Sequence, residues 1–187
     1  MLALVVGNQN YKNLSRLKNP INDGKAMAAK LRARGAIVFE GYDCTIDKMN
    51  EVQRQLLHAV RPGDIVIIFF AGHGVEYQNA NRLMAIGTSE ETDFNKDSWN
   101  VHLLLIALKK KDAAFALVAL DSCRDFVYAS ATRSCRGARS LHDFQTEMDS
   151  IIAFACMPNH PALDGDGDGH GRYALYPTFL RMNEMSA

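Results

Sequence analysis

The sequence predicts an α/β fold with a mainly parallel central sheet. Short runs rich in Val, Ile and Phe alternate along the chain with segments of helical periodicity, an order typical of β-α-β units. Several of these runs are nearly continuous, as expected for strands that are covered on both faces. A length of 187 residues, 48% of them hydrophobic and 22% charged, suits one globular domain with one sizeable core.

Five strands are expected from these apolar runs. They span residues 2–6, 36–40, 64–70, 115–120 and 151–156. The longest run, from Ile65 to Ala71, has the length of a strand. It is far shorter than the run of about 20 apolar residues that a membrane helix needs. We therefore expect a sheet of short, buried strands and no membrane-spanning segment.

The first expected helix lies between the first two strands. Pro20 suits the first helical position after Asn19 as the cap. The helix continues through residues 26–34, which are rich in Ala, Lys and Arg, and Gly35 ends it.

Three more helices are expected. Thr45 can cap the second, whose apolar stripe ends before Pro62 and Gly63. The members of that stripe are Met49, Val52, Leu56 and Val60. The third spans 101–111, with lysines at the negative end of its dipole, and the fourth spans 173–185.

Two polar stretches break the alternation of strands and helices. Residues 75–100, with a strand-like centre at 83–86, are expected to form a small hairpin or flap. Residues 124–150 are expected to form an exposed loop or linker, because their arginines lie among Ser, Thr and Gly.

Charge, termini and cysteines exclude several classes of protein. Lys plus Arg equals Asp plus Glu, 21 against 21, so no net charge recruits nucleic acid or an anionic membrane. The N-terminus lacks a basic segment before an apolar core, so a secretory signal is not expected. The four cysteines form no C-x-x-C pair, which favours reduced thiols and a cytoplasmic location.

Reactive residues follow two of the expected strands. His73, which lies between two glycines, follows the strand expected at 64–70. Cys123 follows the strand expected at 115–120. Ligands of open α/β sheets bind beyond the carboxyl ends of the strands. An imidazole near a thiol there could activate it as a nucleophile, and the backbone N–H groups of Gly74 and Cys123 could receive an oxyanion. The structural alternatives are a core cysteine and an ordinary loop histidine.

Several motifs resemble those of caspase-like cysteine peptidases, above all paracaspases and their bacterial relatives, with metacaspases next. They are Leu4–Asn8 with Tyr11, Asn19–Asp23, Phe70–Gly74, Asp121–Arg124, and Ile152–Ala155 before Asp164. The separation of 50 positions from His73 to Cys123 matches the spacing known for caspases. The resemblance implies a caspase-like α/β/α sandwich in which His73 and Cys123 form the catalytic dyad.

The resemblance also implies a division of the single domain 1–187. Residues 1–123 correspond to a large-subunit-like part that holds both members of the dyad, and 124–150 to the linker. Residues 151–187 correspond to a small-subunit-like part. The family usually continues through another helix and often a strand, so this part is expected to be truncated or reduced.

Acidic residues at matching positions imply a basic substrate. Paracaspases and metacaspases hold Arg or Lys with carboxylates, and the matching residues here are Asp23, Asp121 and Asp164. Carboxylates bind a guanidinium through charge-assisted, often bidentate hydrogen bonds, which favours Arg over Lys. Each has a structural alternative: Asp23 as a helix first-turn residue, Asp121 as a strand-end cap, and Asp164 as part of a solvated turn.

No metal or cofactor is expected. The Asp-Gly run that begins at Asp164 is not an EF-hand loop, because Leu175 takes the twelfth position where a bidentate acid is required. Metacaspases commonly need calcium, but the acidic pairs they use are not evident in residues 75–100. We therefore expect activity without calcium.

The leading hypothesis is a cysteine endopeptidase that cleaves peptides or proteins after Arg or Lys through an acyl-enzyme. Self-cleavage is expected in the linker, at Arg133, Arg136 or Arg139. The alternatives are a caspase-like peptidase that cleaves after Asp or Asn and an inactive caspase-like scaffold. The family has both monomers and homodimers, and the sequence leaves both open.

Overall fold

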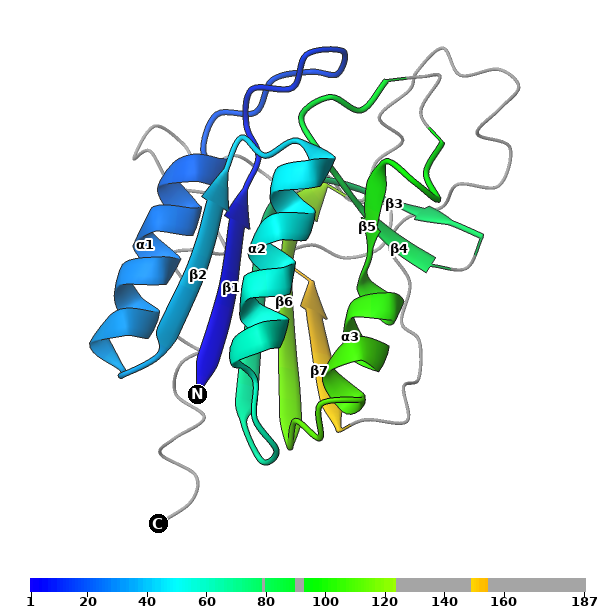
Figure 1. The fold of residues 1–187 in the computed structure, drawn as a ribbon. Helices are drawn as coiled ribbons and strands as arrows, with labels where there is room; N and C mark the ends of the chain where they lie inside the picture. Colours follow the sequence, from blue (N-terminus) through cyan, green and yellow to red (C-terminus); the bar gives the residue numbers. More distant parts are fainter. Residues whose placement is uncertain (79, 90–92, 124–148, 155–187) are drawn as a thin grey trace.

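The computed structural model describes residues 1–78, 80–89, 93–123 and 149–154. Among these residues, five strands pair in parallel and form one sheet (Figure 1). In spatial order they are β2 (Ile37–Tyr42), β1 (Leu2–Gly7), β3 (Ile65–Tyr77), β6 (Phe115–Cys123) and β7 (Ser150–Phe154). The predicted α/β fold with a mainly parallel sheet is confirmed.

Helices cover both faces of this sheet. They are α1 (Pro20–Ala33), α2 (Ile46–Ala59) and α3 (Val101–Lys109). Successive strand residues point to opposite faces, so Leu4 of β1 packs in the cluster with α2 and α3, whereas its neighbour Val5 packs in the cluster with α1. Burial on both faces explains why the strands are continuous apolar runs.

The helix ends follow the predicted signals with one difference. Thr45 caps α2, since its side chain accepts a hydrogen bond from the Lys48 N–H, and the predicted apolar stripe is buried. Pro20 begins α1 after Asn19, but the Asn19 side chain makes no capping hydrogen bond. Gly35 follows the end of α1 with a φ of +79°, the left-handed backbone that glycine adopts readily.

β3 is longer than predicted. Its first part pairs with β1 and β6 in parallel, and from Gly74 onward it pairs with β4 (Ala80–Met84) in antiparallel register. β4 pairs with β5 (Ser98–Asn100), so the expected hairpin is present. The predicted strand end at residue 70 is wrong, because pairing with β6 and then β4 keeps the glycine-rich segment extended. His73 therefore lies within β3 and is not an ordinary loop histidine, which was its structural alternative.

Other boundaries shift by a few residues. β6 continues to Cys123 rather than ending at residue 120, because it stays paired with β3 up to the partners His73 and Cys123. α3 ends at Lys109, two residues before the predicted end, and Asn100 caps its start. The helix predicted at 173–185 lies outside the described residues. In the described part of the chain, no helix is long and apolar enough to cross a membrane.

Candidate active site

The carboxyl ends of the parallel strands bring the predicted site residues to one edge of the sheet. At one level of the register lie four paired residues, Tyr42 of β2, Gly7 of β1, Ala71 of β3 and Asp121 of β6. Two residues further on, His73 of β3 and Cys123 of β6 are direct register partners. Neighbouring strands lie about 4.8 Å apart, so the fold brings these two residues side by side.

The start of α1 lies against the same edge. A Cβ atom on Gly7 would clash with the backbone carbonyl of Pro20, the first residue of α1, so this close approach requires glycine. Asp23 follows in the first turn of that helix and is only 2% exposed. Asp23 therefore holds the first-turn position named as its structural alternative, and its carboxylate is buried there.

The imidazole of His73 is held by one definite hydrogen bond. Its Nε2 lies 2.8 Å from the backbone carbonyl oxygen of Ser15 and 3.4 Å from the Ser15 hydroxyl. A carbonyl oxygen can only accept, so Nε2 carries the hydrogen of the neutral ring. Nδ1 then has the lone pair, and this buried atom has no hydrogen-bond partner among the described residues.

Burial sets the protonation of this ring. His73 is 4% exposed, and loss of water contact lowers its pKa below the ordinary value of 6.5, while the hydrogen bond to the Ser15 carbonyl opposes the shift. The imidazole is therefore neutral near pH 7, with a free lone pair on Nδ1. This is the state in which a histidine can accept a proton.

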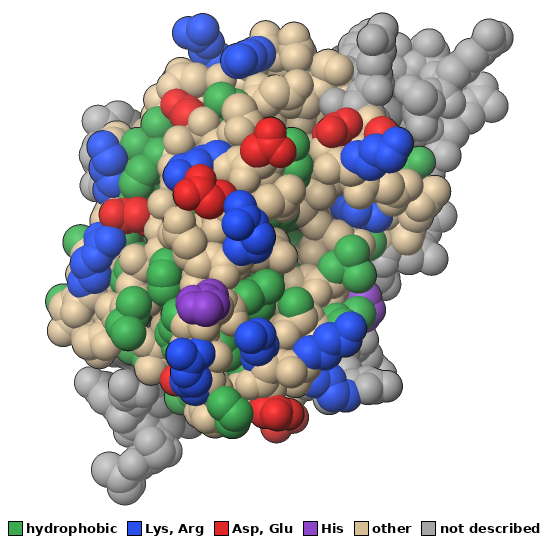
Figure 2. Space-filling model, viewed as in Figure 1, with side chains coloured by type: hydrophobic (Ala, Val, Ile, Leu, Met, Phe, Trp, Pro, Cys, Tyr) green, Lys and Arg blue, Asp and Glu red, His purple; other side chains and the backbone are tan. Residues whose placement is uncertain are grey.

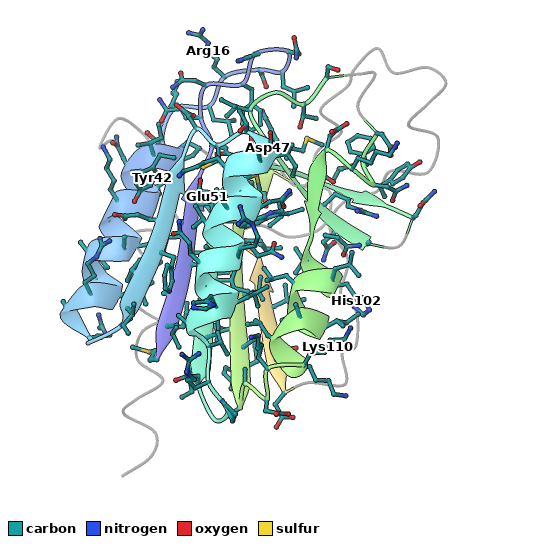
Figure 3. The ribbon with its side chains drawn as sticks, viewed as in Figure 1. Arg16, Tyr42, Asp47, Glu51, His102 and Lys110 are labelled. Carbon is teal, nitrogen blue, oxygen red and sulfur yellow. The ribbon has the colours of Figure 1, made fainter. Side chains whose placement is uncertain are left out.

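The segment from Asn8 to Lys18, which supplies Ser15, is anchored at its start. The Asn8 side chain is fully buried, donates to the Met84 carbonyl at 2.9 Å and accepts from the Cys44 N–H at 2.8 Å. The Asp43 carboxylate accepts from the backbone N–H groups of Gln9 and Asn10, both at 2.9 Å. Figure 3 shows Arg16 of this segment above the carboxyl ends of the strands.

Tyr11 of the same segment contacts His73 directly. Its hydroxyl accepts a hydrogen bond from the His73 N–H at 2.8 Å and donates one to the Met84 carbonyl at 3.1 Å. Its ring centroid lies 4.5 Å from that of the imidazole, with the planes inclined by 54°. A Cβ on Gly72 would come within 2.6 Å of the Tyr11 hydroxyl, so this glycine makes room for the tyrosine.

Sequence reasoning left Ser15 and Tyr11 without a role. Ser15 acts through its backbone carbonyl, which no side-chain pattern can reveal. Tyr11 offered a signal, because a large aromatic side chain in a polar segment usually packs against something. Its contact with His73 depends on the path of residues 8–18, which the sequence does not specify.

The remaining predicted residues divide into two groups. Asp121 is half-buried in β6, and Gly74 lies opposite Leu83 in the first antiparallel pair of β3 and β4. The others lie outside the described residues: Asp164, Arg133, Arg136 and Arg139. In the described part of the chain, no three His, Cys, Asp or Glu side chains gather as a metal site.

The described residues show no single-sign charged surface on the face seen in Figure 2, and Cys44 lies in the core. Basic and acidic side chains are interspersed over the face of the molecule that Figure 2 shows. Cys44 is 1% exposed, and burial raises the pKa of its thiol to about 11. Cys44 is therefore a core residue and not a nucleophile.

Comparison of the sequence with known protein families identifies the family of this domain. The sequence model of the caspase domain matches residues 1–178. The chain belongs to the caspase domain family. Mucosa-associated lymphoid tissue lymphoma translocation protein 1 of Homo sapiens is 25% identical over 124 residues, which make up 66% of this chain. This chain spans only 15% of the length of that human protein.

Two solved structures share the fold of this caspase-like domain. A protein from Geobacter sulfurreducens is 22% identical, with a TM-score of 0.50 over 65% of this chain and 50% of its own. Pro-sf-caspase-1 is 15% identical, with a TM-score of 0.51 over 84% of this chain and 60% of its own. The predicted resemblance to caspase-like peptidases related to paracaspases, and the predicted caspase-like fold, are confirmed.

Proposed function

We propose that the protein is a cysteine endopeptidase that uses Cys123 and His73 and cleaves after basic residues. The observation that carries the proposal is the register pairing of these two residues at the carboxyl edge of the sheet. Register partners on parallel strands lie on the same face of the sheet, and we propose that thiol and imidazole act together there. The family to which the chain belongs supports the peptidase activity.

The state of His73 suits it to serve as the base. With Nε2–H donating to Ser15, the lone pair on Nδ1 takes the thiol proton as sulfur attacks the scissile carbonyl. The backbone N–H groups of Gly74 and Cys123 are proposed to stabilise the oxyanion. The imidazolium then protonates the leaving amine and leaves a thioester. Water attacks the thioester, His73 accepts its proton, and the acid product departs as the thiol re-forms.

Two carboxylates at the sheet edge support a basic substrate residue. Asp121 lies two residues before Cys123, and Asp23 lies in the turn of α1 that begins beside Gly7. Carboxylates bind the planar guanidinium in bidentate fashion, so we propose arginine ahead of lysine before the cut. We further propose that Asp164 helps to bind the basic residue of the substrate. The proposal also includes self-cleavage in the linker and activity without calcium.

A panel of fluorogenic peptides that differ only in the residue before the cut tests the proposal. We expect turnover with Arg, weaker turnover with Lys, and none with Asp or Asn, whether or not calcium is present. In Cys123→Ala, turnover is expected to vanish while the circular dichroism spectrum is kept. Cys44→Ala is the matched control, because it removes a thiol elsewhere and should remain active.

The outcomes separate the alternatives. Turnover that persists in Cys123→Ala would exclude the dyad. Cleavage after Asp or Asn, abolished in Cys123→Ala, would keep the dyad and refute the basic specificity. A wild-type protein that is folded but turns over none of the peptides and does not react with thiol-directed peptide inhibitors would support an inactive scaffold.

A further inference from the structure

We propose that Tyr11 is a positioning residue for His73, with its hydroxyl fixing the main chain of β3 where it carries the imidazole. The inference rests on the proposed function, since a fixed imidazole matters for the rate only if His73 transfers protons. It adds to the dyad a residue that contacts His73 through the backbone and the ring.

The pairing of β3 explains why such a residue is needed. Pairing of β3 with β1 stops at Ala71, and its pairing with β4 begins at Gly74. Between these points lie Gly72 and His73, which in the described part of the chain pair with β6 alone. A buried backbone N–H without a partner costs about as much as a lost hydrogen bond.

Tyr11 fills this gap in the sheet. Its hydroxyl accepts the His73 N–H at 2.8 Å and donates to the carbonyl of Met84, the last residue of β4, at 3.1 Å. One hydroxyl therefore connects β3 to the end of β4 at the point where β3 changes partners. The side chain is 2% exposed, so water does not compete for either hydrogen bond.

The ring and Gly72 fix the geometry further. The ring packs 4.5 Å from the imidazole, so it limits the rotation of the His73 side chain. Gly72 allows this approach, because any Cβ at that position would overlap the Tyr11 hydroxyl. The imidazole is thus held at both ends, by the Ser15 carbonyl at Nε2 and by Tyr11 at its main chain.

Tyr11→Phe isolates the role of the hydroxyl. The ring remains, and the Met84 carbonyl keeps the hydrogen bond from the Asn8 amide at 2.9 Å, so the His73 N–H is the group that loses its partner. Tyr42→Phe is the matched control, because its hydroxyl donates to Glu40 at the protein surface, away from His73.

The test combines steady-state kinetics with hydrogen exchange. We expect Tyr11→Phe to lower kcat by roughly tenfold or more per titrated site, with KM unchanged, because small misplacements of a catalytic group are costly. We also expect the His73 amide to exchange faster in Tyr11→Phe, and both quantities to stay at wild-type values in Tyr42→Phe. Titration with a thiol-directed inhibitor gives the concentration of active sites. Dividing the rate by that concentration keeps any loss of folded protein from lowering the apparent kcat.

The outcomes are decisive in each direction. If Tyr11→Phe matches Tyr42→Phe in kcat and in exchange of the His73 amide, Tyr11 does not position His73. A change in KM with kcat constant would also overturn the proposal. Failure of the dyad itself shows differently, as turnover that survives in Cys123→Ala, and the exchange measurement decides the role of Tyr11 without any turnover.

Discussion

Gly72 is the position where a single methyl group should disturb the site most. In Gly72→Ala the new Cβ would lie 2.6 Å from the Tyr11 hydroxyl and 2.9 Å from the Phe70 ring, and the backbone φ is +154°. A backbone conformation that L residues rarely adopt costs about 1–3 kcal/mol. Overpacking against buried aromatic side chains adds about 1–3 kcal/mol. The substitution should lower the free energy of unfolding by about 2–6 kcal/mol.

Urea unfolding measures this loss against a matched substitution. Gly87→Ala adds the same methyl group where no heavy atom lies within 4 Å, so its effect should stay within about 0.5 kcal/mol. The midpoint for Gly72→Ala should fall with an unchanged m-value. If both variants unfold at the same urea concentration, the close approach of Tyr11 to β3 is wrong, and the proposed positioning of His73 loses its basis.

Three further predictions concern groups around the site. Asn8→Ala should lower the free energy of unfolding by about 1–3 kcal/mol, because it leaves the buried Cys44 N–H without its acceptor; a loss below about 0.5 kcal/mol would contradict this. Because burial lowers the pKa of His73, the unfolded chain binds this proton at higher pH than the folded protein, so stability should fall as the pH drops below about 6.5. His73→Gln should lack that part of the pH dependence, and parallel curves for the two proteins would refute it. At pH 8 a thiol reagent should leave Cys44 unmodified in the folded protein and label it in concentrated urea, as mass spectrometry of tryptic peptides can show; labelling in the folded state would contradict its pKa of about 11.

Hydrophobic pattern was sufficient to predict the sheet and its helices. The continuous apolar runs encode burial on both faces, and the stripe from Met49 to Val60 encodes the buried side of α2. Thr45 and Gly35 mark helix ends through local chemistry that needs no tertiary contact. These features depend on residues close in sequence, which is why they could be predicted.

Features set by long-range pairing were missed. The strand that carries His73 was expected to stop at Phe70, since glycines usually interrupt strands, yet pairing with β6 and β4 extends it to Tyr77. The contacts of Ser15 and Tyr11 with His73 join residues about 60 positions apart. Sequence motifs led to the proposed dyad and acidic residues, but the groups that contact the imidazole are brought to it only by the folded chain.

A peptidyl chloromethyl ketone that ends in arginine, whose chloride a thiolate displaces, reports on Cys123 and His73 together. We expect one covalent adduct, located on Cys123 by mass spectrometry, that forms much more slowly in His73→Ala. A folded protein that acquires no adduct, one labelled on a different cysteine, or one labelled equally fast without His73 would refute the proposed dyad.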